Sequence, residues 1–185
     1  MRKTTILSTI KLNAKHVEMF SENNIELLQY NFIKILPLNF KLPSHNASWI
    51  FTSKNAVDAV YTSNEKVKCN EMPHYCVGEK TKLALLKNGQ KVIKMCNNSV
   101  KLANFIINND KNGKYVFCRG SIINKGFSDF FHTNKINLNE IAVYQTELVP
   151  EKINSIVDGI MFFSPSAIKS FMKKNTLNNS ECFCI

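Results

Sequence analysis

The segment Ile141-Ala142-Val143-Tyr144-Gln145-Thr146-Glu147-Leu148-Val149-Pro150 alternates apolar and β-branched residues with polar ones and ends at a proline. This alternation predicts an extended strand. A series of strand-and-helix units precedes the segment, and a similar unit opens after it at Gly159. We therefore interpret the segment as a linker between two domains, with Tyr144 at the mouth of the cleft that they form. The alternative is an ordinary edge strand in which Tyr144 is half-buried.

The chain before this segment repeats one pattern four times: a short apolar run, a polar or glycine-containing turn, and a segment with helical spacing. In the clearest case, Trp49-Ile50-Phe51 is followed by Thr52-Ser53. A hydroxyl residue between a strand and a helix is a typical N-cap, and Asn88-Gly89 suits the end of a helix. The pattern predicts an α/β fold with parallel sheets, whose ligands bind beyond the carboxyl ends of the strands.

An internal repeat relates Trp49–Val57 to Ile160–Ile168. Each copy is an apolar run followed by a hydroxyl residue, Ser53 or Ser164, and then a helix-like segment. The simplest interpretation is that both serines are helix caps. The alternative is that two such turns, each offering backbone N–H groups, hold one anionic ligand from two sides.

The net charge of +10 comes from 24 basic and 14 acidic side chains and favours an anionic partner. An AT-rich genome, which enriches lysine, is an equally simple explanation. The lysines are scattered, Arg2 and Arg119 are the only arginines, and no nucleic-acid-binding motif is present. The sequence therefore argues against a nucleic-acid-binding protein.

The cysteines form no Cys-x-x-Cys pair, which argues against a zinc site. In a chain of this size without a recognisable signal peptide, they indicate free thiols in a reducing cytoplasm. The sequence contains no run of about 18 apolar residues, so no membrane span is predicted. The six cysteines are Cys69, Cys76, Cys96, Cys118, Cys182 and Cys184.

Five short motifs, taken in order, resemble the uroporphyrinogen-III synthase family. Individually each is weak, but the ordered set covers most of the chain. They are Phe51-Thr52-Ser53-x-x-Ala56-Val57, Val77-Gly78-x-x-Thr81, Arg119-Gly120, Val143-Tyr144-x-Thr146 and Phe163-Ser164-Pro165-Ser166-Ala167.

The resemblance implies two parallel-sheet α/β domains joined by a two-stranded linker. Residues 1–36 and 149–185 would form one discontinuous domain, and residues 47–139 the other. Residues 37–46 and 140–148 would be the linker strands. The second copy of the repeat stops at Ile185, where the first copy continues with Gly78 and a helix, so we expect the discontinuous domain to be incomplete.

The resemblance also implies the chemistry. The substrate would be hydroxymethylbilane, a polyanionic linear tetrapyrrole with eight carboxylates, which is cyclised with loss of water and inversion of the last ring. No metal or cofactor is expected, and we expect a monomer whose domains close on the ligand. Tyr144 would be the catalytic residue that donates a proton to the departing hydroxyl. The substrate-binding residues would be Thr9, Ser53, Lys54, Gly78, Lys80, Thr81, Arg119, Gly120, Ser164 and Ser166.

Two other interpretations stay open at this point. A two-lobed α/β module that binds an anionic ligand without chemistry would have the same loops and charge, but would give Tyr144 no special role. An inactive, truncated synthase would keep the family's motifs without its activity. The first is distinguished by replacing Tyr144 with Phe, which should leave ligand binding unchanged.

Overall fold

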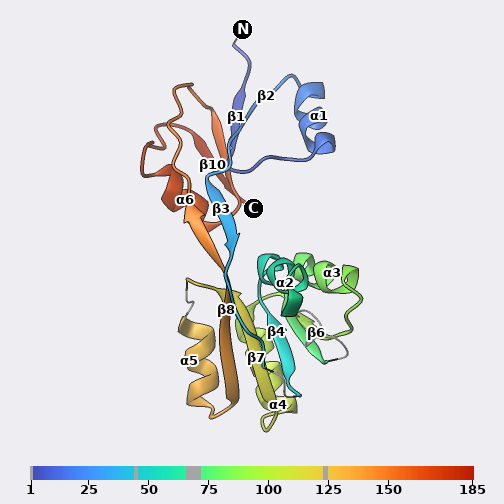
Figure 1. The fold of residues 1–185 in the computed structure, drawn as a ribbon. Coiled ribbons are helices and arrows are strands. Elements are labelled where there is room, and N and C mark those ends of the chain that lie inside the picture. The colour runs from blue at the N-terminus through green and yellow to red at the C-terminus, as the bar shows by residue number, and fades with distance from the viewer. Residues whose placement is uncertain (1, 44–45, 66–71, 123–124) are drawn as a thin grey trace. The chain divides into compact units, whose positions relative to one another are not determined.

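The structure, a computed structural model, describes residues 2–43, 46–65, 72–122 and 125–185. Within it the chain divides into two compact units. Unit 1 consists of residues 1–34 and 146–185, and unit 2 of residues 35–145. Each unit is built from a parallel sheet with helices on its faces, so the α/β class predicted from the strand-and-helix pattern is confirmed (Figure 1).

Unit 1 contains a four-stranded sheet in the order β10-β9-β1-β2, with all neighbouring strands parallel. Its core is formed by Leu7, Phe32, Ile160, Phe162 and Phe171 with Ala167. Its elements are β1 (Thr5–Ser8), α1 (Ala14–Glu22), β2 (Glu26–Gln29), β9 (Gly159–Phe162), α6 (Pro165–Phe171) and β10 (Glu181–Cys184).

Unit 2 is organised around a six-stranded sheet in the order β3-β8-β7-β4-β5-β6. The pairs β8·β7, β7·β4, β4·β5 and β5·β6 are parallel. The elements are β3 (Ile33–Pro37), β4 (Ser48–Phe51), α2 (Lys54–Tyr61), β5 (His74–Val77), α3 (Glu79–Lys87), β6 (Val92–Cys96), α4 (Ser99–Asn109), β7 (Lys114–Gly120), α5 (Lys125–Thr133) and β8 (Asn137–Leu148). Strands β3 and β8 each extend across the boundary between the two units in the sequence.

Two hydrophobic clusters cover the two faces of this sheet. On one face, α2 and α3 pack against Trp49, Phe51 and Val116. On the other, α4 and α5 pack against Ile50 and Phe117. Alternate residues of a strand point to opposite faces, so the continuous apolar runs of β4 and β7 are those of strands buried on both sides.

The helix ends follow the local signals in the sequence. The Ser53 hydroxyl accepts a hydrogen bond from the backbone N–H of Asn55 at the start of α2. Ser164 accepts one from Ala167 at the start of α6, whose first residue is Pro165. Gly89, with φ of +74°, follows the end of α3 in the left-handed region where glycine is favoured. These caps confirm the predicted boundaries.

We predicted a linker strand over residues 37–46, but the structure has no strand over residues 38–43. Strand β3 ends at Pro37, residues 38–43 have no regular structure, and residues 44–45 lie outside the described residues. Proline lacks the N–H that a strand would need, and a second proline, Pro43, follows in the same segment. The apolar run before this segment forms two strands, β2 and β3, which belong to different sheets.

Candidate active site

Several of the predicted site residues meet at the carboxyl edge of the unit 2 sheet. Ser53 follows β4, Gly78 follows β5, and Gly120 is the last residue of β7. These three strands are parallel neighbours, so their carboxyl ends lie along one edge. Tyr144 of β8 is paired with Gly120. The structure thus brings together residues that are up to 91 positions apart in the sequence.

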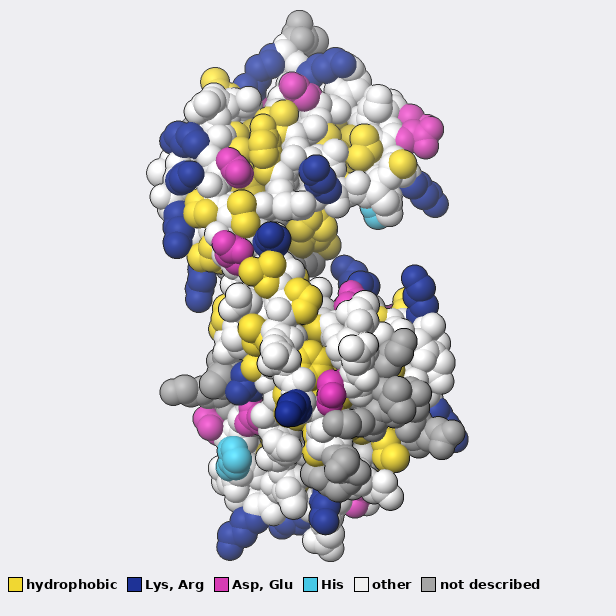
Figure 2. Space-filling model, viewed as in Figure 1, with side chains coloured by type: hydrophobic (Ala, Val, Ile, Leu, Met, Phe, Trp, Pro, Cys, Tyr) yellow, Lys and Arg dark blue, Asp and Glu magenta, His cyan; other side chains and the backbone are white. Residues whose placement is uncertain are grey.

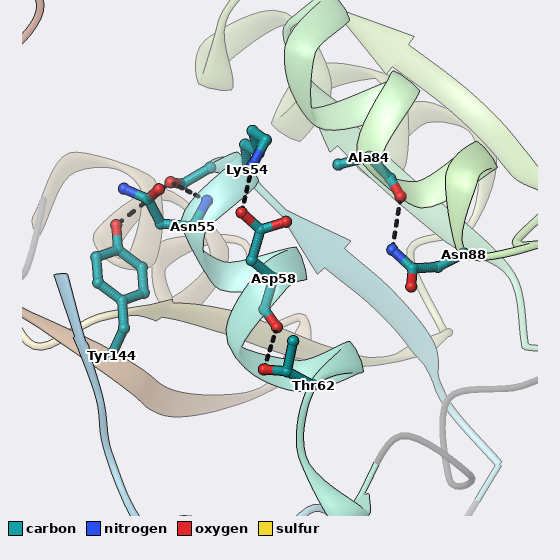
Figure 3. A network of polar contacts seen from close by, with 8 residues as sticks. Lys54, Asn55, Asp58, Thr62, Ala84, Asn88 and Tyr144 are labelled. Carbon is teal, nitrogen blue, oxygen red and sulfur yellow. Dashed lines mark hydrogen bonds and ion pairs between the residues drawn. The ribbon is translucent and has the colours of Figure 1, made fainter. Parts of the chain in front are cut away.

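Tyr144 lies beside the start of α2. Its phenol donates a hydrogen bond to the Ser53 hydroxyl, with 3.4 Å between the two oxygens, and Figure 3 shows the phenol pointing toward this helix start. The same Ser53 oxygen accepts the N–H of Asn55 at 3.1 Å. Because the first turn of a helix carries unpaired N–H groups and a partial positive charge, the phenol oxygen is close to a site that favours negative charge.

The start of α3 is open. Its N-cap, Gly78, has φ of +83°, a conformation that side chains rarely adopt, and has no side chain with which to cap the helix. No atom lies within 4 Å of the position that a Cβ on Gly78 would take. The space beside the N-cap of α3 is therefore open. Thr81, by contrast, is only 4% exposed and lies on the buried face of the helix, so its side chain is not part of this opening.

The predicted cations differ in their surroundings. Lys54 forms an exposed ion pair with Asp58 one turn along α2 (Figure 3). Such a pair is weak, so Lys54 can be drawn away by a ligand at little cost. Lys80 is exposed, and no ion pair of its side chain is found among the residues that the structure describes. Both are near the helix starts just described.

Arg119 points away from Tyr144. Its Nε donates to a carboxylate oxygen of Glu140 at 2.7 Å, and both side chains are about 17% exposed. The residue two positions earlier, Phe117, packs on Phe127 of α5 with 4.9 Å between ring centroids. Because residues two apart on a strand share a face, Arg119 is on the α5 side of the sheet, where its charge is balanced. Sequence reasoning did not identify Glu140 as its partner, since nothing local links the two.

The remaining predicted residues belong to unit 1. Thr9 is fully buried and its hydroxyl donates to the Met161 carbonyl at 2.8 Å, so it joins the ends of β1 and β9 rather than facing a ligand. Ser164 caps α6 and lines a cavity of about 280 Å³. Ser166 is half-buried in the first turn of α6.

A larger cavity in unit 1, of about 670 Å³, lies where β1, β9 and β10 begin, next to Thr4, Asp158 and Ser180. This is the amino edge of the unit 1 sheet. Ligands of parallel α/β folds gather at the opposite edge, so the volume of this cavity does not by itself make it the site.

Two buried titratable groups are outside the candidate site. Burial lowers the pKa of His74 to about 4, and burial raises the pKa of the Cys76 thiol to about 11. At neutral pH His74 is therefore uncharged and Cys76 is a thiol, not a thiolate nucleophile. Among the described residues, no group of three or more His, Cys, Asp or Glu side chains is arranged to hold a metal ion.

The positive charge of the chain is concentrated in the unit that contains Tyr144. Residues 35–145 hold 15 of the 24 basic and 7 of the 14 acidic side chains, which gives +8 of the net +10. Figure 2 shows the Lys and Arg side chains dispersed over the visible face and not gathered into one stripe. None of the described helices is long and apolar enough to cross a membrane.

The sequence matches the family model described as uroporphyrinogen-III synthase HemD over residues 15–185. The chain belongs to the uroporphyrinogen-III synthase family. A comparison with curated protein sequences found no significant match.

Several solved structures have the same fold as this chain. A uroporphyrinogen-III synthetase from Helicobacter pylori superposes with a TM-score of 0.73 at 18% sequence identity, covering 100% of this chain and 84% of that one. A mutant uroporphyrinogen III synthase from Thermus thermophilus gives a TM-score of 0.65 at 10% identity, covering 98% and 83%. At such identities the likeness concerns the fold, and the roles of individual residues must be argued from their own geometry.

Proposed function

We propose that this chain cyclises hydroxymethylbilane to uroporphyrinogen III, with loss of water and inversion of the last pyrrole ring. The observation on which the proposal rests is the position of Tyr144 in a member of this family. Its phenol lies at the carboxyl edge of a parallel sheet, 3.4 Å from the Ser53 hydroxyl at the start of α2. A phenolic proton donor next to a helix start suits a reaction in which a neutral hydroxyl departs from a polyanionic substrate.

Proton transfer from Tyr144 starts the proposed reaction. The phenol donates its proton to the terminal hydroxyl of the substrate, the carbon–oxygen bond breaks, and water leaves. The pyrrole nitrogen next to this carbon donates its electron pair to the electron-deficient carbon, which gives an azafulvene cation. The resulting phenolate is stabilised by the Ser53 hydroxyl and by the positive end of α2.

The cation is then attacked by the substituted carbon of the last pyrrole, and rearrangement of the spiro intermediate inverts that ring. The ring finally loses one proton, which restores the phenol of Tyr144, so the overall change is the loss of one water molecule. The contribution of the protein to these steps is positioning and exclusion of water, because the pyrroles themselves supply the electrons.

Carboxylate binding is assigned to the two helix starts at the same edge. The space at Gly78, the N-cap of α3, is open, and Lys80 in the first turn of this helix is exposed. At the start of α2, Lys54 is held only by an exposed pair with Asp58. Backbone N–H groups at helix starts, together with a nearby ammonium group, are a general arrangement for binding anions. The net charge of +8 in unit 2 attracts the same substrate.

The roles of the unit 1 residues and the boundaries of the functional domains remain proposals. We assign residues 1–36 with 149–185 to one domain and residues 47–139 to the other. Ser164 and Ser166 are kept as carboxylate-binding residues, whereas Thr9 is better explained by its bond to Met161. We also propose that the chain is a monomer, which gel filtration of the purified chain tests, and that it works in the cytoplasm.

The decisive experiment generates hydroxymethylbilane in situ, adds the chain, oxidises the products and measures the ratio of type III to type I uroporphyrin. We expect an excess of type III. The Tyr144→Phe variant should lose about 100-fold in rate, the usual contribution of a general acid. Tyr30→Phe is the matched control, because Tyr30 is an exposed tyrosine of unit 1 and should leave the rate unchanged.

A non-catalytic binding module is the second candidate. It is favoured by the internal partners of Lys54, Arg119 and Thr9, which satisfy these side chains without a ligand. In that case only type I uroporphyrin forms, while uroporphyrin still raises the melting temperature of both the wild-type chain and Tyr144→Phe. An inactive synthase would likewise give only type I uroporphyrin, but uroporphyrin would not raise its melting temperature.

A further inference from the structure

A break in the register of β7 and β8 sets the position of Tyr144. The two strands pair residue for residue from Lys114 with Asn137 to Arg119 with Ala142. The register then shifts by one, so that Gly120 is opposite Tyr144 and not Val143. Such bulges are uncommon between parallel strands and often re-aim a side chain next to a functional site. Without the shift, Val143 would occupy the position that Tyr144 takes.

The ring of Tyr144 lies directly against Gly120. A Cβ added to Gly120 would be 2.8 Å from Cζ of the ring, 3.0 Å from Cε2 and 3.0 Å from the phenol oxygen. The first distance is shorter than Cβ contacts in proteins essentially ever are, and the other two are tighter than nearly all of them. The backbone at Gly120 is not in the left-handed region that favours glycine. The glycine is therefore needed for the space that it leaves, and that space is filled by the tyrosine.

The backbone is held at the same place. The N–H of Ser121, the residue after Gly120, donates to the Tyr144 carbonyl at 2.8 Å. The main chain of Tyr144 and its ring are thus both in contact with the end of β7. From this position the phenol reaches the Ser53 hydroxyl at the start of α2.

We propose that Gly120, together with the bulge opposite it, is a positioning residue for the phenol of Tyr144. Gly120 acts by having no side chain, and not by binding a substrate carboxylate. The contribution of Gly120 to the reaction rests on the proposed function. The steric part of the proposal is independent of it and can be tested without substrate.

A double-mutant cycle in stability tests the steric part. Gly120→Ala should lower the melting temperature of unit 2 by several degrees in the wild-type chain and much less in a Tyr144→Ala background, where the ring is gone. Gly113→Ala is the matched control. Its Cβ would meet Asp110 and Tyr115 instead, at 2.5 and 2.8 Å, so it should be equally destabilising in both backgrounds. Equal losses for Gly120→Ala in the two backgrounds would overturn the proposal.

A spectroscopic measurement locates the effect on the phenol itself. With 3-fluorotyrosine in place of the five tyrosines, the ¹⁹F resonance that disappears in Tyr144→Phe belongs to Tyr144. Gly120→Ala should shift that resonance, and Gly113→Ala should leave it in place. An unmoved Tyr144 resonance in folded Gly120→Ala protein would also overturn the proposal.

The rate of type III formation tests the catalytic part. Gly120→Ala should lower kcat about as much as Tyr144→Phe does, about 100-fold, with little change in KM, because a displaced phenol is no better than an absent one. In the Tyr144→Ala background it should cost nothing further. An equal rate loss in that background would assign Gly120 to substrate binding. If the stability and ¹⁹F results are as expected but the wild-type chain forms only type I product, the positioning stands and the proposed function fails.

Discussion

Acidification should destabilise unit 2 through His74. This side chain is fully buried between Tyr61, Phe51 and the backbone. Its Nδ1 is 2.7 Å from the Met72 carbonyl, which can only accept, so Nδ1 carries the proton and Nε2 accepts the hydroxyl of Tyr61 at 2.8 Å. Both ring nitrogens are thus satisfied in the neutral form, and burial disfavours the charged ring.

The magnitude follows from the two pKa values. Burial lowers the pKa of His74 to about 4, whereas it is 6.5 in the unfolded chain. Between these values the unfolded state binds more protons, so the free energy of unfolding falls as the pH falls. The loss is about 2 kcal/mol between pH 7 and pH 5 and about 3 kcal/mol by pH 4, with only about 0.4 kcal/mol more from this residue below that.

Trp49 provides the assay. It is the only tryptophan of the chain and is fully buried in unit 2, so its fluorescence during urea unfolding reports on this unit. The wild-type chain should lose about 2 kcal/mol between pH 7 and pH 5. His74→Asn keeps a donor for the Met72 carbonyl but does not titrate, so it should be less stable at pH 7 and should lack most of this loss.

The control is His16→Asn, which changes an exposed histidine of α1 in unit 1 and should leave the pH dependence as in the wild type. If the wild type and His74→Asn lose the same free energy between pH 7 and pH 5, the neutral, buried histidine is not the cause of the acid sensitivity. If the free energy of unfolding of the wild type rises as the pH falls, His74 does not bind protons more readily in the unfolded state, and the reasoning is wrong.

Two further predictions concern the core and the thiols. Phe131→Ala should lower the free energy of unfolding by about 3–5 kcal/mol, the usual cost of removing a fully buried aromatic ring. Urea unfolding followed by Trp49 fluorescence measures this loss. A loss below about 1 kcal/mol would mean that the α5 face of the sheet is not packed as described. Iodoacetamide should modify the exposed Cys182 and Cys184 in the native protein well before Cys76, because Cys76 is buried and its pKa is raised to about 11. Peptide mass spectrometry after increasing times with iodoacetamide measures the three rates. Modification of Cys76 as fast as of the other two would contradict the prediction.

The carboxyl-edge site was only partly accessible to sequence reasoning. The pairing of a hydroxyl residue with each helix start identified Ser53 and Ser164, because a cap is a contact between residues two or three positions apart. The resemblance to the family assigned Thr81 and Thr9 to the substrate, whereas the structure buries both. Burial depends on which face of a helix or strand end meets the core, and no local motif specifies it.

The sequence by itself determined the α/β class, the parallel strands and the helix boundaries, because alternation, caps and glycine turns act over a few residues. The tertiary structure decided which residues meet at the site. The one-residue shift between Arg119 and Gly120 places Tyr144 against Gly120, and the pair formed by Arg119 and Glu140 removes that arginine from the site. These contacts join strands that are distant in the sequence. Their register is set by the packing of the whole sheet, so it exists only once the sheet has formed.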